Sequence, residues 1–100
     1  MTSAKRMVED IVGCKWSLSV IHMVDQGINR PGAMVRAEDG LSTKVLNERL
    51  NKLQRYGIIE KTSYPEIPPR VEYSLTAFGG KFLKIIRAIE TLDDELTPSS

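Results

Sequence analysis

The sequence contains one cysteine, and a single thiol cannot form an internal disulfide. Such a chain is typical of a reducing compartment. No apolar stretch approaches the roughly 20 residues that a helix needs to cross a bilayer, and the N-terminus lacks the layout of a signal peptide. These absences exclude a disulfide-rich scaffold and predict a cytoplasmic protein without a membrane partner.

The residue types of catalytic and metal sites are also scarce. The one histidine, His22, and the one cysteine, Cys14, have no spacing that would collect the ligands of a metal ion, and no glycine-rich loop could cradle a phosphate. Trp16 and His22 would suit a pocket for a small organic effector, but a tryptophan at a helix start is usually part of the core. We therefore expect no enzyme activity, no metal and no cofactor.

Positive and negative charges nearly balance: the sequence has 14 lysines and arginines and 13 acidic residues, for a net charge of +1. This is low for a nucleic-acid-binding protein. The distribution is uneven, however: residues 42–75 hold six cations and four anions, whereas the C-terminal end gathers acidic residues. A modest electrostatic attraction to DNA would depend on the avidity of a dimer.

The length of 100 residues predicts one small domain, covering residues 1–100. A chain this short buries only a thin core, so an oligomer that covers more apolar surface would stabilise it.

The most informative stretch begins with a helix from Ser42 to the residue before Gly57. Ser42 is a favourable N-cap, and Gly57 is the usual left-handed residue beyond a helix C-terminus. A buried stripe is predicted from the i, i+4, i+7 spacing of Leu46, Leu50 and Leu53. The opposite face carries amides and cations, which can bond base edges and phosphates, although a solvated helix face fits the same pattern.

A β-hairpin is predicted after this helix. Residues 58–64 and 70–75 alternate apolar with polar side chains, and the proline-rich segment 65–69 between them cannot continue a ladder. Lys61 and Arg70 flank the tip. A helix and a basic-flanked hairpin that project together are typical of a winged helix.

Short helices complete the predicted fold. Pro31 suits the first turn of a helix through Glu38, and a turn at Asp39–Gly40 then leads to Ser42, which is the helix-turn-helix layout. Further helices are predicted over 4–12, 15–25 and 77–96, with Gly27 ending the second and Thr76 capping the last, and a frayed tail over 97–100. Apolar residues cover about half the circumference of the last helix, more than its own core needs. The fold class is thus α+β and mostly helical: a winged helix-turn-helix with a two-stranded β-hairpin wing and flanking dimerisation helices.

Several motifs resemble the HxlR-type family of bacterial transcription regulators, which is similar to the MarR type. They lie at residues 13–16, 30–32, 40–42, 45–50, 56–59 and 64–76. The most specific is Tyr-Pro-Glu-Ile-Pro-Pro-Arg-Val-Glu-Tyr at 64–73. The resemblance covers nearly the whole chain. It implies a homodimer that binds operator DNA, with the N-terminal and C-terminal helices in the dimer interface.

The candidate DNA contacts follow from the docking geometry of this motif, in which the N-terminal end of the second helix enters the major groove. Base contacts are expected there, and backbone contacts are expected from the flanking segments and the wing. The predicted DNA-binding residues are Arg30, Arg36, Ser42, Thr43, Lys44, Asn47, Asn51, Lys61 and Arg70. The partner would be double-stranded operator DNA with a pseudo-palindromic sequence.

Cys14 is a candidate redox sensor. Many proteins of the resembled family carry a cysteine well before the tryptophan of the Gly-Lys-Trp stretch, but the matching position here is near Ser3, which is not a thiol. Cys14 instead precedes Lys15, and a neighbouring lysine can make a thiol more reactive. A lone cysteine is also commonly a small packed residue, so a redox or small-molecule effector stays open.

Two other functions fit the sequence less well than a regulator that binds operator DNA. A winged helix can serve as a protein-interaction module without specific DNA binding, and the low net charge permits this alternative. An enzyme would need a supported nucleophile or a ligand cluster, and the sequence has neither.

Overall fold

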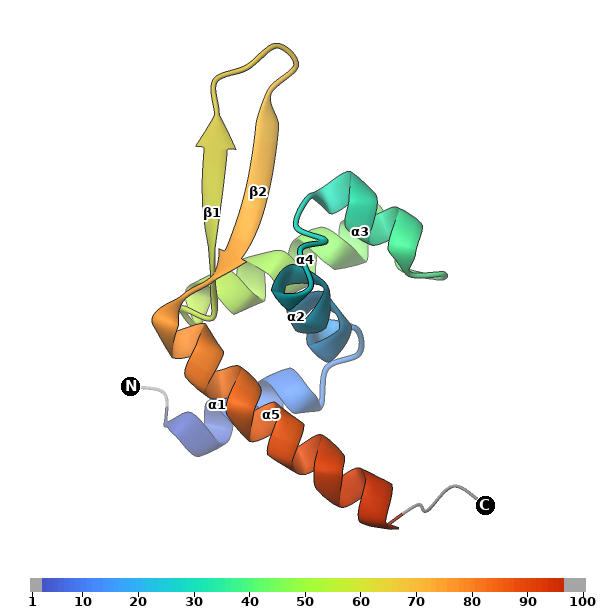
Figure 1. Ribbon diagram of the computed structural model, residues 1–100, viewed down its shortest axis with the longest axis vertical. Helices are drawn as coiled ribbons and strands as arrows, with labels where there is room; N and C mark the ends of the chain where they lie inside the picture. The colour runs from blue at the N-terminus through green and yellow to red at the C-terminus, as the bar shows by residue number, and fades with distance from the viewer. Residues whose placement is uncertain (1–2, 97–100) are drawn as a thin grey trace.

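The computed structural model describes residues 3–96 of the chain. Over this range it contains five helices and one two-stranded sheet, which confirms the predicted mostly helical α+β fold. The elements in chain order are α1 (Ala4–Val12), α2 (Ser17–Asp25), α3 (Pro31–Ala37), α4 (Thr43–Arg55), β1 (Ile59–Tyr64), β2 (Arg70–Leu75) and α5 (Ala77–Leu96) (Figure 1). The predicted frayed tail at 97–100 lies outside the described residues. No helix within 3–96 has both the length and the apolar content that a membrane crossing requires.

The helix α4 forms as its local sequence predicts. The Ser42 side chain accepts a hydrogen bond of 3.1 Å from the backbone N–H of Val45, which satisfies a free donor of the first turn. Leu46, Leu50 and Leu53 are fully buried. The helix ends before Gly57, whose φ of 74° is left-handed. Glycine adopts this conformation without steric strain because it has no Cβ.

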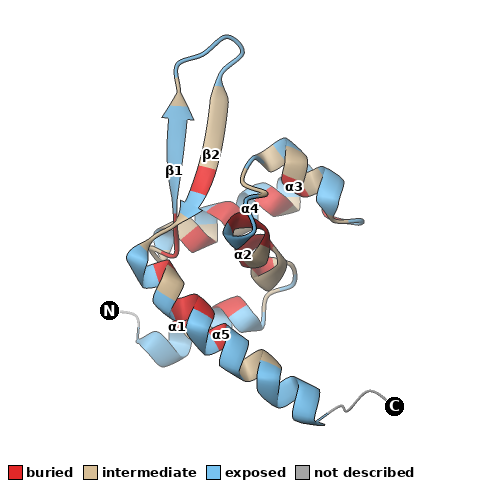
Figure 2. Cartoon of the chain, in the orientation of Figure 1, coloured by how far each residue is buried: buried red, intermediate tan, exposed pale blue. Residues whose placement is uncertain are grey.

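The hairpin of β1 and β2 is an antiparallel pair in the register Ile59↔Leu75 to Tyr64↔Arg70. It extends well beyond the helices (Figure 1), and only its root is buried, through Ile58, Ile59 and Tyr73 (Figure 2). The backbone N–H of Tyr73 also donates to the carbonyl of Asn29, at 2.9 Å. This bond ties the connector between α2 and α3 to the side of the wing.

The predicted start of α2 is two residues too early. Trp16 has a φ of 75°, so the chain is left-handed there and the helix begins at Ser17. Such a φ is uncommon for a bulky residue and interrupts a right-handed helix. Trp16 packs against the core, and its ring approaches Gly40, where a Cβ would lie 3.6 Å from the indole. The indole therefore supports the turn that leads into α4.

Part of the apolar face of α1 is buried within this chain. Met7 and Ile11 are buried in the core of this chain, because α1 packs across α2 and brings this face inward. Only Val12 among the large apolar residues of α1 is exposed, and Val8 is half-buried.

The start of α5 is held against the root of the wing. The backbone N–H of Gly79 donates to the Thr76 hydroxyl at 2.8 Å, which confirms Thr76 as the cap. A Cβ at Gly79 would meet the carbonyl oxygen of Ile58 at 1.9 Å, whereas one at Gly80 would meet nothing within 4 Å. The absence of a side chain at Gly79 thus allows the backbone of α5 to approach that of Ile58 closely.

Candidate nucleic-acid interface

The outer face of α4 is exposed within the described chain. Thr43, Lys44, Asn47 and Asn51 are exposed, and none of their side chains has a hydrogen bond or ion pair within residues 3–96. Thr43, Lys44 and Asn47 occupy the N-terminal half of the helix, and Asn51 lies one turn further along, on the side away from the buried leucines. The arrangement leaves the donors and acceptors of these side chains at the surface of α4.

Two other cations of α4 are directed into the body of the protein. The Nε of Arg49 donates to the carbonyl oxygen of Lys15 at 2.8 Å, and the Nζ of Lys52 lies 2.7 Å from the Oδ1 of Asp10. A count of cations over residues 42–75 therefore overstates the charge that this region presents. On α4 itself, Lys44 and Arg55 are the cations without an ion pair within residues 3–96.

Asp10 joins α1 to α4 through two charge-assisted hydrogen bonds. Lys52 donates to its Oδ1, and the hydroxyl of Tyr56 donates to its Oδ2 at 2.6 Å. Both bonds lower the pKa of Asp10 below 3.8, and the bond from Lys52 has the larger effect. The bond to Asp10 raises the pKa of Lys52 above 10.5 and that of Tyr56 above 10.0. The sequence gives no sign of this pairing, which fixes the C-terminal half of α4.

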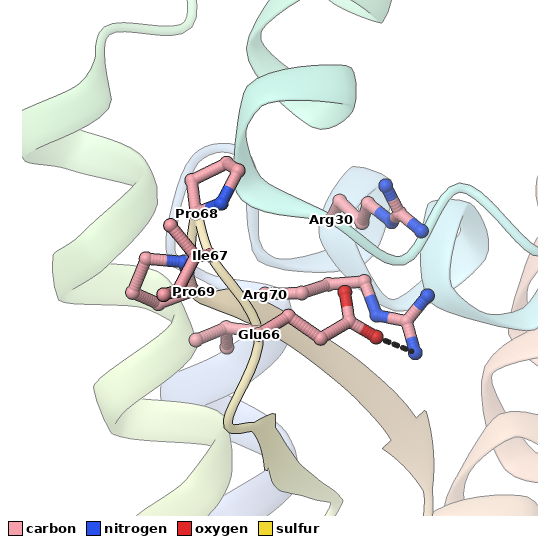
Figure 3. Close-up of a pocket in the computed structure, with 7 residues that line it drawn as sticks. Arg30, Glu66, Ile67, Pro68, Pro69 and Arg70 are labelled. Carbon is pink, nitrogen blue, oxygen red and sulfur yellow. Dashed lines mark ion pairs between the residues drawn. The ribbon is translucent and has the colours of Figure 1, made fainter.

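The wing carries a network that links two predicted DNA-binding arginines. One oxygen of Glu72, Oε2, lies 3.3 Å from the Nη2 of Arg30 and 3.6 Å from the Nε of Arg70. The Nη2 of Arg70 also lies 3.3 Å from the Oε1 of Glu66 (Figure 3), and the Arg70 guanidinium stacks on the Tyr64 ring at 4.0 Å. Arg70 is therefore a paired, half-buried side chain rather than a free charge at the wing tip.

The remaining predicted contacts stand apart from this network. Lys61 on β1 and Arg36 on α3 are exposed, and neither has an ion pair within the described chain. Ser42 is exposed as well, and its hydroxyl caps α4. The structure thus brings Arg30 and Arg70 together and leaves the others as separate surface groups around α4 and the wing.

The sequence and the fold are similar to those of known proteins. A family model described as HxlR-like helix-turn-helix matches residues 11–100 of the chain. The chain belongs to the HxlR-like helix-turn-helix family. The resemblance of the wing motif is thereby confirmed, and the family is one of transcription regulators rather than enzymes.

Relatives of this HxlR-like chain carry the same kind of description. An uncharacterized HTH-type transcriptional regulator of Synechocystis is 43% identical over 88 residues, which cover 88% of this chain and 65% of that protein. The chain thus spans just under two thirds of that relative's length. A putative MarR-family regulator from Porphyromonas gingivalis W83 is 37% identical, with 99% of this chain and 98% of that chain covered and a TM-score of 0.74.

The transcriptional regulator YodB from B. subtilis, solved in its reduced form, has a similar structure. Its TM-score to this HxlR-like chain is 0.83, with 26% identity and coverage of 98% of this chain and 97% of that chain. Because these matches extend over the helices and the wing alike, they support a winged helix of the MarR-like type.

Cys14 of this HxlR-like chain lies in the turn between α1 and α2 and is half-buried. Its carbonyl accepts a hydrogen bond from the N–H of Ser17, at 3.2 Å. The ammonium of Lys15 lies 5.2 Å from the centroid of the Trp16 ring. The hydrogen bond to Asp10 is the main reason why the pKa of Lys52 is raised, and the nearby Cys14 side chain raises it further. No group of three or more potential metal ligands occurs within the described residues.

A second surface of this HxlR-like chain lies along α5. Phe82, Leu83 and Ile86 are buried, while another face of the same helix exposes large apolar side chains. These are Phe78, Ile85, Leu92 and Leu96, with half-buried Ile89 between them. The C-terminal half of the helix extends past the other helices and is largely exposed (Figures 1 and 2).

Two polar side-chain contacts hold α5 on α2. The Nε2 of His22 lies 3.0 Å from the Oε2 of Glu90, and the Nη2 of Arg87 lies 2.8 Å from the Oδ2 of Asp25. His22 is thus a contact between helices, and it lines neither the hollow beside the wing tip nor the hollow between α1 and Phe78. Sequence patterns alone could not identify these pairs, because 68 and 62 residues separate the partners.

Proposed function

We propose that the protein is a sequence-specific DNA-binding transcription regulator that acts as a homodimer on a pseudo-palindromic operator. The observation that carries this proposal is the outer face of α4, where Thr43, Lys44, Asn47 and Asn51 are exposed and unengaged within the described chain. Amide and ammonium groups on a docked helix can discriminate base edges in the major groove. Membership of a family of transcription regulators supports the same function. Because chromosomal DNA is the partner, we expect the protein in the cytoplasm.

The residues divide into two roles. Thr43, Lys44 and Asn47, at the N-terminal end of the recognition helix, and Asn51, one turn further along, would reach base edges. Contacts to the DNA backbone would come from the surrounding elements, because such contacts position a protein without reading sequence. These residues are Arg30, Arg36, Ser42, Lys61 and Arg70.

The homodimer is supported by the apolar stripe of α5. Ile85, Ile89, Leu92 and Leu96 follow one another at intervals of four, three and four residues, which is the spacing of a helix-to-helix seam. Leu92 is 57% exposed and Leu96 is 81% exposed, so the C-terminal end of the stripe is largely uncovered within the described chain. Pairing α5 with its copy about a two-fold axis would bury it. Two recognition helices could then reach half-sites about 34–36 Å apart.

Fluorescence anisotropy tests the DNA-binding proposal. Binding to the duplex upstream of the protein's own gene is compared with binding to a scrambled duplex across a salt series. We expect the upstream duplex to bind more tightly, and both affinities to fall as salt rises. Lys44→Ala and Asn47→Ala should each cost about 1–3 kcal/mol of discrimination between the duplexes.

Arg55→Ala is the matched control, because Arg55 is an exposed cation at the other end of α4. It should lower affinity equally for both duplexes. Discrimination that survives Lys44→Ala and Asn47→Ala would contradict the assigned base contacts. Equal and weak binding of the unmodified protein to both duplexes, repeated with fragments selected from a genomic library, would contradict the proposed function itself.

Sedimentation analysis tests the dimer. Leu92→Glu introduces a charge into the stripe, and we expect it to shift the protein towards monomer and to weaken operator binding. Thr91→Glu adds the same charge one residue away, on another face of α5, and should leave the dimer intact. Equal behaviour of the two variants would exclude this stripe as the interface.

An effector that changes DNA binding fits the position of Cys14, next to the turn that begins α2. The similar YodB structure is described as a reduced form, which supports a redox signal as one class of effector. Anisotropy with and without diamide, in the unmodified protein and in Cys14→Ser, tests this. Loss of binding on oxidation in the first but not in the second would assign the response to Cys14, and identical responses would exclude it.

A protein-interaction module is the alternative function. The pairing of Arg30 and Arg70 with carboxylates reduces the positive charge at the wing, and Ile67 at the wing tip is fully exposed. An apolar tip of this kind suits a protein partner. A wing-dependent protein partner that is lost in Ile67→Asp, together with no salt-dependent DNA affinity, would favour this alternative.

A further inference from the structure

Two arginines from distant parts of the chain converge on a single carboxylate oxygen. The Nε and Nη2 of Arg30 lie 3.4 and 3.3 Å from the Oε2 of Glu72, and the Nε of Arg70 lies 3.6 Å from the same atom. Arg30 precedes α3, whereas Arg70 and Glu72 belong to β2. The backbone bond from Tyr73 to Asn29 holds these two segments side by side.

The contacts to Glu72 are long for ion pairs. Charge-assisted N–H···O bonds are typically about 2.7–2.9 Å. The pairs that fix helices in the body meet this range, with 2.7 Å between Lys52 and Asp10 and 2.8 Å between Arg87 and Asp25. The wing arginines are thus held more loosely than the cations that have a structural role.

Arg70 is also incompletely satisfied. Its Nε is buried and has no hydrogen-bond partner within the described chain, because 3.6 Å to Glu72 is too long for a hydrogen bond. A buried donor without a partner is costly, so a better-placed acceptor would stabilise this guanidinium. Its stacking on Tyr64 at 4.0 Å meanwhile keeps the plane of the group in a defined orientation.

The two arginines border an open hollow. Figure 3 shows the side chains of Arg30 and Arg70 extending in the same direction, beside the segment from Glu66 to Pro69. The hollow has a volume of about 370 Å³, so a phosphate group can approach both guanidiniums. Guanidinium groups match the geometry of phosphate oxygens, and two of them can bind one phosphate through several donors.

We propose that Arg30 and Arg70 form one site for a DNA backbone phosphate, and that Glu72 holds the two guanidiniums together while competing with that phosphate. This inference rests on the proposed function. In the free protein the Glu72 carboxylate occupies the place of an anion. On binding, the phosphate replaces it, and the arginines exchange one acceptor for another. Glu72 is therefore a positioning residue that lowers affinity for every DNA sequence alike.

Glu72→Gln tests the competition, because glutamine keeps the shape of the side chain and removes its charge. Freeing two partly exposed ion pairs should tighten binding roughly two- to tenfold. The gain should be the same for the duplex upstream of the gene and for the scrambled duplex, since a phosphate carries no sequence information.

Glu60→Gln is the matched control. Glu60 is an exposed carboxylate of the same wing and has no ion pair within residues 3–96, so its loss changes the net charge equally without freeing an arginine. Its effect on affinity should be clearly smaller than that of Glu72→Gln. In the Arg30→Gln background the gain from Glu72→Gln should shrink, because a double-mutant cycle reports the shared contact. Melting curves confirm that each variant is folded at the assay temperature.

The outcomes separate the two proposals. If the unmodified protein binds DNA and Glu72→Gln behaves like Glu60→Gln, the phosphate site is wrong and the proposed function stands. A gain confined to the upstream duplex would also overturn the site, since it would indicate a base contact. If the unmodified protein binds no DNA, the proposed function fails and this inference fails with it. A larger, sequence-independent gain from Glu72→Gln that depends on Arg30 establishes the site.

Discussion

Gly79 offers a direct test of how α5 is joined to the wing. A Cβ at this position would lie 1.9 Å from the carbonyl oxygen of Ile58 and 2.9 Å from its carbonyl carbon, well inside the 3.0 Å that real Cβ atoms respect. The clash is with backbone, and the same carbonyl accepts the N–H of Thr76 at 3.1 Å. Gly79→Ala must therefore displace either α5 or the root of β1 by about an ångström or more.

The size of the effect follows from the type of strain. Overpacking by one methyl group typically costs about 1–3 kcal/mol, and a clash with backbone places Gly79→Ala at the upper end. For a domain of this length, each kcal/mol shifts the melting temperature by about 4–8 °C. We expect Gly79→Ala to melt more than about 10 °C below the unmodified protein, as followed by circular dichroism at one fixed protein concentration.

Gly80→Ala is the internal control. The next residue is in the same helical turn, and a Cβ there meets nothing within 4 Å. Replacing a helical glycine by alanine in open space should stabilise the protein by about 0.5–1 kcal/mol. Opposite signs for the two variants would support the close approach of α5 to Ile58. A Gly79→Ala protein that melts at or above the unmodified protein would refute it.

Three further predictions concern α4. Asp10→Asn should lower the melting temperature near neutral pH and have little effect in acid. The pKa of Asp10 in the folded protein is below 3.8, so its contribution to the free energy of unfolding is present above pH 3.8. This contribution is lost as the pH falls through the lowered pKa. A difference between the two proteins that is constant from pH 7 to pH 3 would contradict the pairing. Because folding raises the pKa of Lys52 above 10.5, the stabilisation from this group should be present below pH 10.5 and decline as the pH rises through the raised value, which alkaline melting curves can follow. Ser42→Ala removes the cap of α4 and should cost about 1 kcal/mol of unfolding free energy in denaturant titrations, whereas an unchanged midpoint would show that the hydroxyl does not cap the helix.

The ion pairs of the protein divide into two sets with different consequences. Short pairs join α1 to α4 and α2 to α5, and they fix the helices that present the recognition face. Longer contacts at the wing involve the arginines that we assign to the DNA backbone. A regulator of low net charge can thus keep cations near its DNA-binding surface while pairing them in the free state. Under this interpretation, the net charge of +1 is a poor guide to function.

Local sequence determined the boundaries and faces of the best-predicted elements. Ser42 and Gly57 act on backbone groups within a few residues of themselves, so the limits of α4 could be predicted without knowledge of the rest of the chain. The leucine spacing likewise determined which face is buried, because helix geometry alone sets that periodicity. The proline-rich tip and the alternation on either side predicted the wing for the same reason.

Only the tertiary structure decided which charged residues are available. Lys44 and Lys52 have the same charge and lie on the same helix, yet the first is exposed without an ion pair in the described chain and the second is bound to Asp10. The difference depends on how α1 crosses α4, and Asp10 lies 42 residues away in sequence. Arg30 and Glu72 are equally distant in sequence and meet only because the connector pairs with β2. The left-handed backbone at Trp16 and the contact of Gly79 with Ile58 likewise come from packing between elements, which short-range patterns do not encode.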